Sequence, residues 1–445
     1  MGKLFGTDGI RGIAGKYPID IETGKRLGYF LVGYCRARGK STYIITGRDT
    51  RESGKVLEKA VSAGILAAGG TVKSAGIIPT PGVAFLAKKG GCGAGVLISA
   101  SHNPFEYNGF KLFSGDGYKF SEAEENEIEN KILDTDTILS IPDLESMTIL
   151  ENEKDYGTFL KNIVRDKEKL KDYSIVIDCS NGSASVVAPE LFRELGIKAD
   201  IIFSNPDGKN INDNCGSQHT EVLSKKVIEK HADLGLAFDG DADRLIAVDE
   251  TGTTLTGDQI IAICSKMLYE KNELKNNAVV TTVMSNMGLG AALKEMDIIH
   301  EKTGVGDRLV MEKMREIGSS IGGEDSGHII FADNHTTGDG ILSALQLLNA
   351  IAFFGKPLSE LANIMKIYPQ VLINVKVKNK PEISTVPEIK KAIDDAEAGL
   401  GENGRILVRY SGTEPLCRVM VEGKDQAEIE RYAEDISIII EKELN

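Results

Sequence analysis

One pattern occurs three times in the chain, and it limits the possible folds more than any other feature. Each copy has a short apolar run, a loop of small residues and an amphipathic stretch with helical spacing. The runs are YIITGRD (43–49), SIVIDCSNG (174–182) and AVVTTVMSNMG (278–288). Short apolar runs that alternate with helical stretches predict strands buried between helices. We therefore expect α/β domains whose sheets are covered on both faces.

A weaker similarity joins VLISAS, IVIDCS and VVTTVMS. Each passes from β-branched residues into a small-residue loop that contains a serine. Three related α/β units would explain this similarity. Chance would explain it equally well, because buried strands draw on the same few residue types. Both explanations stay open.

Residues 371–445 follow a different pattern. VLINVKVK alternates with a period of two, while RILVRY and LCRVMVEG flank a turn that contains glycine. A helical stretch near 426–442 ends the chain. We expect a small α+β unit with an antiparallel sheet, preceded by a linker at 367–370.

The charge balance and the cysteines exclude several classes of protein. Lys and Arg total 52 against 66 Asp and Glu, for a formal net charge of −14. This charge repels nucleic acids and anionic membranes, so we expect neither as a partner. There is no apolar run of about 18 residues and no signal-peptide pattern at the start. The six cysteines have neither CxxC nor Cys/His metal spacing. We therefore expect a cytoplasmic protein with reduced thiols.

The first candidate site is the loop SASHNP (99–104), which follows the apolar run GVLI. Ser101 lies where a strand is expected to end, and side chains there can be exposed to a ligand. It is therefore a candidate nucleophile. A turn serine that caps a helix is the simpler interpretation of this loop alone. This loop does not have the GxSxG pattern of α/β-hydrolases.

The second candidate site is DGDADR (239–244), which follows the apolar run LGLAF. Asp239, Asp241 and Asp243 can converge their carboxylates on one hard cation. A calcium EF-hand is excluded, because Arg244 occupies the place where that loop needs glycine, and because apolar strands flank the loop. A solvated acidic loop is the other alternative, but three adjacent carboxylates repel one another without a cation. We therefore predict a metal site.

Two further loops carry groups that suit polar or anionic ligands. GGEDSGH (322–328) brings glycine backbone together with Glu324, Ser326 and His328, which suit sugar hydroxyls. RYSGTEP (409–415) offers the guanidinium of Arg409 and an anion-binding nest of amides. Taken alone, the first loop is more simply interpreted as an ordinary polar turn, and the second fits a simple hairpin turn equally well.

Together and in this order, the four loops resemble the α-D-phosphohexomutase superfamily along nearly the whole chain. The resemblance implies four domains around a central cleft, three α/β domains with mixed sheets and one small α+β domain with an antiparallel sheet. The implied ranges are 1–152 with the phosphoserine loop, 153–252 with the metal loop, 253–367 with the sugar loop and 371–445 with the phosphate loop.

The resemblance also implies the roles of single residues. Ser101 carries the phosphoryl group, and Asp239, Asp241 and Asp243 bind Mg²⁺, with the Ser101 phosphate completing the metal site. The implied acid, base or charge-stabilising groups are Arg11, His102, Lys111 and His328, and the general base stays open among the first three. The implied substrate-binding residues are Arg244, Gly306, Asp307, Arg308, Glu324, Ser326, Arg409, Ser411, Gly412, Thr413 and Arg418.

Further motifs resemble the bacterial phosphoglucosamine mutases within that superfamily: FGTDGIRG (5–12), NPDGKNINDNCGS (205–217), GVGDR (304–308) and NHTTGDG (334–340). The resemblance implies conversion of glucosamine 6-phosphate to glucosamine 1-phosphate through a 1,6-bisphosphate, for UDP-N-acetylglucosamine synthesis. Glucosamine 1,6-bisphosphate or glucose 1,6-bisphosphate is then the expected activator.

The specificity and the assembly are less constrained. The sugar loop reads GEDSGH where this subfamily commonly has GEQSGH, so Asp325 replaces an amide. Its carboxylate either pairs with the substrate's ammonium or faces solvent. A phosphomannomutase/phosphoglucomutase is the alternative enzyme, and a non-catalytic sugar-phosphate sensor is the alternative from another class. The oligomeric state stays open, with a homodimer as one option.

Overall fold

The computed structural model describes residues 4–6, 8–134, 139–143, 154–411 and 415–445. They form two compact units. The first lies within Met1–Met284 and Met296–Ile364, and the second within Ser285–Glu295 and Met365–Asn445. Among the helices of the described residues, none has the length and apolarity that crossing a bilayer requires.

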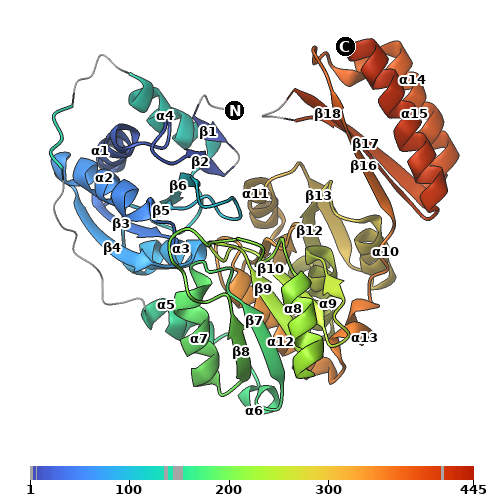
Figure 1. The fold of residues 1–445 in the computed structure, drawn as a ribbon, viewed down its shortest axis with the longest axis horizontal. Helices are drawn as coiled ribbons and strands as arrows, with labels where there is room; N and C mark the ends of the chain where they lie inside the picture. Colours follow the sequence, from blue (N-terminus) through green and yellow to red (C-terminus); the bar gives the residue numbers. More distant parts are fainter. Residues whose placement is uncertain (1–3, 7, 135–138, 144–153, 412–414) are drawn as a thin grey trace. The chain divides into compact units, whose positions relative to one another are not determined.

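The first sheet contains six strands in the order β1-β2-β6-β5-β3-β4 (Figure 1). Successive residues of β3 and β5 point into two cores on opposite faces. Ile44 and Val96 pack with residues of α1, α2 and α4, whereas Ile45 and Leu97 pack with α3. This sheet is therefore covered by helices on both faces. The elements are β1 (Phe5–Gly6), β2 (Gly9–Ile13), α1 (Ile21–Ala37), β3 (Tyr43–Arg48), α2 (Gly54–Ala67), β4 (Thr71–Ile77), α3 (Thr80–Lys89), β5 (Ala94–Ile98), β6 (Tyr107–Ser114) and α4 (Glu122–Leu133).

The second sheet has the order β11-β10-β9-β7-β8, and the third has the order β13-β12-β14-β15. The second region contains α5 (Lys154–Lys161), α6 (Lys167–Leu170), β7 (Ser174–Asp178), α7 (Ala184–Leu195), β8 (Lys198–Ile202), α8 (Glu221–Lys230), β9 (Leu234–Phe238), β10 (Leu245–Asp249) and β11 (Thr254–Leu255). The third contains α9 (Gly257–Glu270), η1 (Lys275–Asn277), β12 (Ala278–Thr282), β13 (Ile299–Thr303), α11 (Asp307–Ile317), β14 (Ile321–Gly323), β15 (Ile329–Phe331), α12 (Gly340–Phe354) and α13 (Leu358–Ala362).

The three sheets share a four-stranded arrangement. In the first sheet, β5 pairs antiparallel with β6 and parallel with β3, and β3 pairs parallel with β4. The other two sheets repeat this pattern. The sets are β6-β5-β3-β4, β10-β9-β7-β8 and β15-β14-β12-β13. The loops SASHNP, DGDADR and GEDSGH therefore occupy the same connection, between the two antiparallel strands of each set.

This arrangement supports three related units and corrects one alignment. IVIDCS lies on β7 and VVTTVMS on β12, which are equivalent strands. VLISAS lies on β5, whose equivalents are β9 and β14, so grouping it with the other two was wrong. The counterpart of β7 and β12 in the first sheet is β3, which carries YIITGR.

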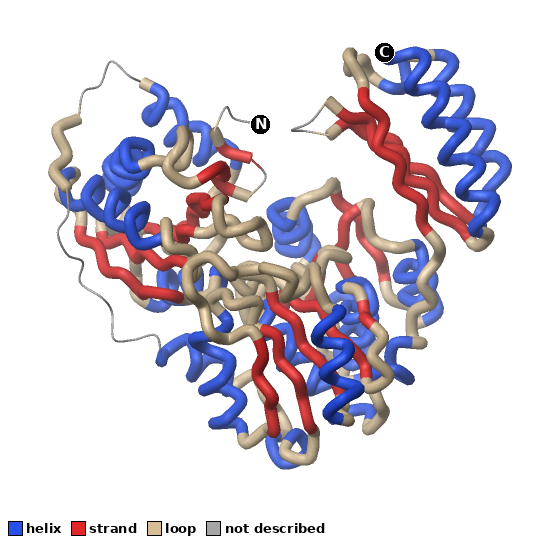
Figure 2. Tube along the Cα trace, viewed as in Figure 1, coloured by secondary structure: helices blue, strands red, loops and turns tan. Residues whose placement is uncertain are grey.

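The second unit is built on an antiparallel sheet in the order β16-β18-β17, with α14 and α15 on one face (Figures 1 and 2). Val375, Val419 and Val421 pack there against Ile389 of α14 and Ile436 of α15. The elements are α10 (Met287–Glu295), β16 (Gln370–Lys376), η2 (Ile383–Thr385), α14 (Pro387–Leu400), η3 (Gly401–Asn403), β17 (Gly404–Tyr410), β18 (Leu416–Gly423) and α15 (Gln426–Leu444). The predicted fold class, mixed sheets between helices and a final antiparallel sheet, is confirmed.

Candidate active site

Ser101 is held in an unusual conformation at the end of β5. Its φ is 53°, in the left-handed region that residues other than glycine and asparagine rarely adopt, and its side chain is 1% exposed. Its hydroxyl donates to Oδ2 of Asp239 at 2.5 Å and lies 3.3 Å from Nδ1 of His102. The nucleophile predicted on one loop therefore contacts the acidic cluster predicted on another.

Asp239, Asp241 and Asp243 form one buried cluster between β9 and β10. One carboxylate oxygen from each lies within 4.8 Å of the others, so the group can hold a metal ion. Oδ1 of Asp241 and Oδ1 of Asp243 are buried and accept no hydrogen bond from any described residue. Burial, and next the charges of Asp243 and Asp241, raise the pKa of Asp239 well above its usual value. A divalent cation with oxygen ligands would relieve both the repulsion and the unsatisfied oxygens.

Lys111 reaches the same cluster from β6. Its Nζ donates to Oδ2 of Asp241 at 2.7 Å and to Oδ2 of Asp243 at 3.1 Å, and it lies 3.0 Å from Oδ2 of Asp8. Burial alone lowers the pKa of Lys111, but these three carboxylates raise it well above its usual value. Lys111 is therefore an ammonium ion in this arrangement.

His102 and Arg11, the other two candidate bases, differ in charge. Burial, followed by the charges of Arg244 and Arg11, lowers the pKa of His102 to about 4, so its imidazole is neutral at pH 7. Arg11 donates to Asp8. Although burial lowers the pKa of Arg11, Asp8 and then Asp241 raise it overall. Among the three candidates, only His102 is uncharged.

Arg244 follows the acidic cluster directly. Its backbone amide donates to Oδ1 of Asp239 at 3.2 Å, and its Nε lies 3.8 Å from Oδ1 of Asp243. Burial lowers the pKa of Arg244, but the charges of Asp243 and Asp239 raise it overall. The loop thus supplies a cation beside its own carboxylates.

The sugar loop connects β14 to β15 and reaches the metal cluster. His328 places Nδ1 3.7 Å from Oδ2 of Asp243 and Nε2 3.3 Å from Oδ2 of Asp307. Gly327 has a φ of 91°, and a Cβ there would lie 2.2 Å from the carbonyl oxygen of Leu245, so glycine is needed for the loop to lie against β10.

The other residues of the sugar loop differ in exposure. Glu324 accepts a hydrogen bond from the amide of Gly306 at 3.2 Å, and burial raises its pKa. Ser326 is exposed. Asp325 is half-buried, and its Oδ1 is buried without a hydrogen-bond partner among the described residues. A half-buried side chain with a buried oxygen argues against an orientation fully into solvent.

Sequence reasoning missed two charged residues, and one of them connects the first region to the third. Asp8 contacts Arg11, Lys111 and Lys119, and Lys119 also lies 2.5 Å from Oδ2 of Asp307. Asp8 lies in FGTDGIRG, three residues before Arg11, so that motif carried a signal for it. Nothing local distinguishes Lys119.

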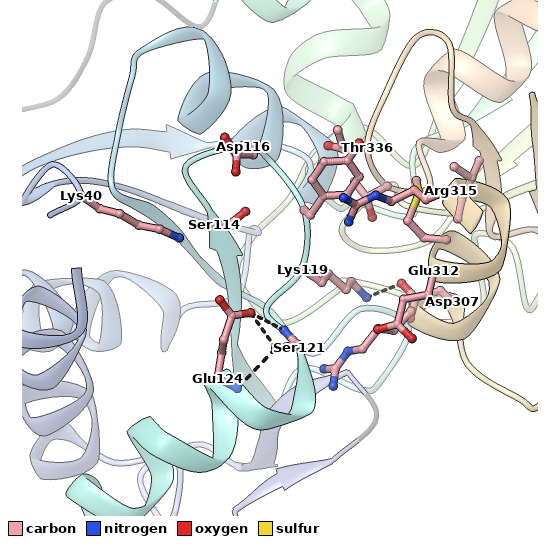
Figure 3. A pocket seen from close by; sticks show the side chains of 15 residues that line it. Lys40, Ser114, Asp116, Lys119, Ser121, Glu124, Asp307, Glu312, Arg315 and Thr336 are labelled. Carbon is pink, nitrogen blue, oxygen red and sulfur yellow. Dashed lines mark hydrogen bonds and ion pairs between the residues drawn. The ribbon is translucent and has the colours of Figure 1, made fainter. Parts of the chain in front are cut away.

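The Lys119–Asp307 pair also lines a cavity of about 450 Å³, shown in Figure 3. Ser114 and Thr336 line it too, and Lys40 and Arg315 lie on opposite sides of it in this view. Ser101 and the three aspartates are not among its lining residues. A second cavity, of about 410 Å³, adjoins His102 and is lined by Pro104, Asn212 and His219, among others.

Arg308 at the start of α11 pairs with a buried carboxylate of α4. Its Nη2 lies 2.6 Å from Oε2 of Glu125, which is 4% exposed. Gly306 precedes the helix with a φ of 131°. Burial raises the pKa of Glu125 to about 7, although Arg308 opposes this shift. Glu125 was not predicted.

In the second unit, Arg409 of β17 and Arg418 of β18 are directly opposite each other in the strand register. Burial, followed by the charge of Arg418, lowers the pKa of Arg409. The amide of Ser411 donates to the carbonyl of Leu416 at 2.9 Å. Gly412 and Thr413, also predicted for this loop, lie outside the described residues.

Models of four family domains match the chain in order. They are described as phosphoglucomutase/phosphomannomutase alpha/beta/alpha domains I (residues 2–138), II (154–252) and III (256–368) and the C-terminal domain (372–439). Phosphoglucosamine mutase of Syntrophobacter fumaroxidans is 49% identical over 444 residues, which cover 99% of each chain. The chain belongs to the phosphoglucosamine mutase branch of this family. The predicted reaction class, a phosphohexose mutase, is thereby confirmed.

Solved structures share the fold. A phosphoglucomutase/phosphomannomutase family protein from Burkholderia thailandensis superposes with a TM-score of 0.81 at 24% identity, covering 99% of this chain and 98% of the other. N-acetylphosphoglucosamine mutase of Aspergillus fumigatus, in complex with GlcNAc-6P and magnesium, gives a TM-score of 0.67 at 17% identity and covers 99% and 95%. At these identities the likeness supports the fold.

Proposed function

We propose that the chain interconverts glucosamine 6-phosphate and glucosamine 1-phosphate, with Ser101 as the phosphoryl carrier. The observation that carries this proposal is the 2.5 Å contact between the Ser101 hydroxyl and Asp239, beside two buried carboxylate oxygens without hydrogen-bond partners among the described residues. The relative at 49% identity supports the substrate. The product would supply UDP-N-acetylglucosamine synthesis.

Asp239, Asp241 and Asp243 would hold Mg²⁺, because carboxylate oxygens are its preferred protein ligands. The metal would supply charge neutralisation for the transferring phosphoryl group. Magnesium in the Aspergillus fumigatus relative supports this choice of ion.

The chain's own residues handle the remaining charge and the proton. In the first step, the free sugar hydroxyl bonds to phosphorus, the bond from phosphorus to Ser101 Oγ breaks, and the hydroxyl loses its proton. His102, which is neutral and adjoins Ser101, takes this proton and passes it to Ser101 Oγ, so that the serine leaves as a hydroxyl. Lys111 and Arg11 are cations in this site and stabilise charge instead. Burial lowers the pKa of His328, but Asp243 and Asp307 raise it overall, which favours the charged form and a similar role.

The second step returns the other phosphate of the 1,6-bisphosphate to Ser101. The sugar must present two positions in turn, so the phosphate that is not reacting needs its own binding site. Arg409, Ser411, Gly412, Thr413 and Arg418 would form that site. An enzyme that loses the bisphosphate is left without its phosphoryl group, so glucosamine or glucose 1,6-bisphosphate should activate it.

The rest of the substrate-binding set completes the proposal. Glu324 and Ser326 would bind sugar hydroxyls, while Arg244, Gly306, Asp307 and Arg308 would lie along the substrate. We further propose that the enzyme acts in the cytoplasm and that its four domains span 1–152, 153–252, 253–367 and 371–445. The oligomeric state stays open, with a homodimer as one option.

A coupled assay tests the substrate. Purified enzyme with Mg²⁺ and a trace of glucose 1,6-bisphosphate is given glucosamine 6-phosphate, mannose 6-phosphate or glucose 6-phosphate, and kcat/KM is compared. We expect the amino sugar to be preferred by at least about tenfold, since a charged group in a matched site contributes at least about 1.4 kcal/mol. Equal or higher kcat/KM for a neutral hexose phosphate would support the phosphomannomutase/phosphoglucomutase alternative.

A further inference from the structure

Two side chains, those of Arg51 and Asn212, donate hydrogen bonds to the backbone of the loop that carries Ser101. The motifs described above assign neither of them a role in the reaction. Arg51 follows β3 in the first sheet, and Asn212 lies between β8 and α8 in the second. Both donate to the same two carbonyl oxygens, those of Ser101 and Asn103. The distances are 3.0 and 2.7 Å from Nη2 of Arg51, and 2.9 and 3.1 Å from Nδ2 of Asn212.

Arg51 is itself fixed. Its side chain is fully buried, and its Nε lies 2.9 Å from Oδ2 of Asp49. The same carboxylate oxygen accepts from the hydroxyl of Ser99 at 2.6 Å, and that hydroxyl accepts from the amide of Ser101 at 2.9 Å. Arg51 also donates to the carbonyl of Pro104. The guanidinium fork thus binds three carbonyls of one loop from a single rigid plane.

Asn212 connects the Ser101 loop to the acidic cluster of Asp239, Asp241 and Asp243. The backbone N–H of Asn212 donates to the carbonyl of Ser180 at 2.9 Å, and this bond anchors Asn212 to the second region. At Gly240, between Asp239 and Asp241, an added Cβ would lie 2.6 Å from the carbonyl of Ser101 and 2.8 Å from Nδ2 of Asn212. The serine carbonyl, the asparagine amide and the metal loop are therefore in direct contact.

A left-handed conformation costs about 1–3 kcal/mol for a residue such as serine and persists only when the surroundings enforce it. The hydrogen bonds from Arg51 and Asn212 explain how Ser101 keeps this conformation. Its direct consequence is the direction of the hydroxyl, because rotation of the peptide at Ser101 would move Oγ away from Asp239.

We propose that Arg51 and Asn212 are positioning residues for phosphoryl transfer, acting on the backbone of the nucleophile. They hold Ser101 against the metal cluster while the sugar changes orientation, so that both transfer steps use one geometry. This inference rests on the proposed function. We call Arg51, Asn212 and the carbonyls of Ser101 and Asn103 the carbonyl clamp.

Asn212→Ala tests the clamp, with Asn214→Ala as the matched control. Asn214 lies on the same loop, also has a positive φ (50°), and donates to Asp213 rather than to the Ser101 loop. Both substitutions therefore carry a similar backbone cost. We expect Asn212→Ala to lower kcat by about 10- to 100-fold, because misplacement of a reacting group by about 1 Å has effects of this size. KM should stay within about twofold of that of Asn214→Ala.

Single-turnover transfer from phosphorylated full-length enzyme to glucosamine 6-phosphate should slow by the same factor, while the melting temperatures of the two variants agree. A purely structural role would lower the melting temperature and leave the kcat of the folded fraction unchanged. Asn212→Ala with the kcat of Asn214→Ala overturns the clamp. If wild-type enzyme in the same assay has no mutase turnover, the proposed function fails instead.

Arg51→Lys tests the clamp from the first sheet, and it decides the matter if Asn212→Ala does not fold. Lysine keeps the charge beside Asp49 but cannot span three carbonyls with one plane. We expect the same loss of kcat with little change in KM. A folded Arg51→Lys enzyme with wild-type kcat contradicts the proposal.

Discussion

The acidic cluster around Ser101 and the strand pair β17–β18 treat charge in opposite ways. Around Ser101, the cation of Lys111 contacts three carboxylates of the chain itself. On β17 and β18, two arginines are opposite each other, and the charge of Arg418 helps to lower the pKa of Arg409. In the first region, opposite charges of the chain neutralise one another. In the second, two like charges adjoin, and the phosphate of the proposed substrate would relieve their repulsion.

The two regions should therefore affect different kinetic constants of the enzyme. Changes at the acidic cluster should act mainly on kcat, and changes at the strand pair mainly on KM. Three experiments can break or sharpen that distinction, and a fourth tests the stability contribution of the buried Glu125.

Ser101→Ala should have the largest effect, a loss of turnover of at least roughly a thousandfold, because it removes the proposed phosphoryl carrier. Intact mass should show a fraction of wild-type protein with one added phosphoryl group and none in the variant. Ser180→Ala is the matched control, since Ser180 is also buried with a positive φ (52°), but its hydroxyl donates to the carbonyl of Cys179. Phosphorylation that survives in Ser101→Ala would contradict the carrier role.

Metal removal should come next. EDTA should lower kcat by about a hundredfold or more, and Mg²⁺ should restore it, because charge neutralisation by a metal contributes several kcal/mol. Titration with Mn²⁺ gives a readout independent of activity, and Asp241→Asn should weaken that binding. Full activity after exhaustive chelation would argue against the aspartate site.

Arg409→Ala should raise KM by about 10- to 100-fold with little change in kcat, since a charge-assisted hydrogen bond contributes about 1.5–3 kcal/mol. Arg431→Ala is the control, because Arg431 is an exposed arginine of the same unit that lies over the ring of Tyr432. A drop in kcat without a change in KM would place Arg409 with the chemistry and erase the distinction between the two regions.

Glu125→Gln should have the smallest effect, on stability alone. Because burial raises the pKa of Glu125 to about 7, the folded state binds its proton more tightly than the unfolded state does. This contribution to stability is present below pH 4.5 and is lost as pH rises through about 7. The variant should therefore gain stability relative to wild type by about 2 kcal/mol between pH 5 and pH 8, measured as the difference in melting temperature. Parallel pH profiles would contradict the assignment.

The predictable part of the molecule is the part whose chemistry is local. Ser101 at a strand end and three aspartates at alternate positions are unusual in sequence, and the structure brings them into contact. The alternation in β16 and the apolar runs of β9 and β12 likewise predicted strands correctly. VLISAS was grouped with the wrong strands because β3 and β5 are both buried strands of similar composition, so their sequences alone do not distinguish them.

The missed residues act over long separations in sequence. Asn212 reaches Ser101 across 111 positions, and Arg308 reaches Glu125 across 183. Asn212 is one of several similar residues in a polar loop, and Lys119 has no unusual neighbours. Their importance comes from the docking of one sheet's loops on another, which a single sequence does not encode locally.

The shared connection of the three loops has a consequence for engineering. The proposed nucleophile, the proposed metal ligands and the proposed sugar contacts each come from the same connection in a separate sheet, and each sheet has hydrophobic packing of its own. A library that randomises 324–326 alone can therefore explore new hexose specificities while the other two loops stay intact.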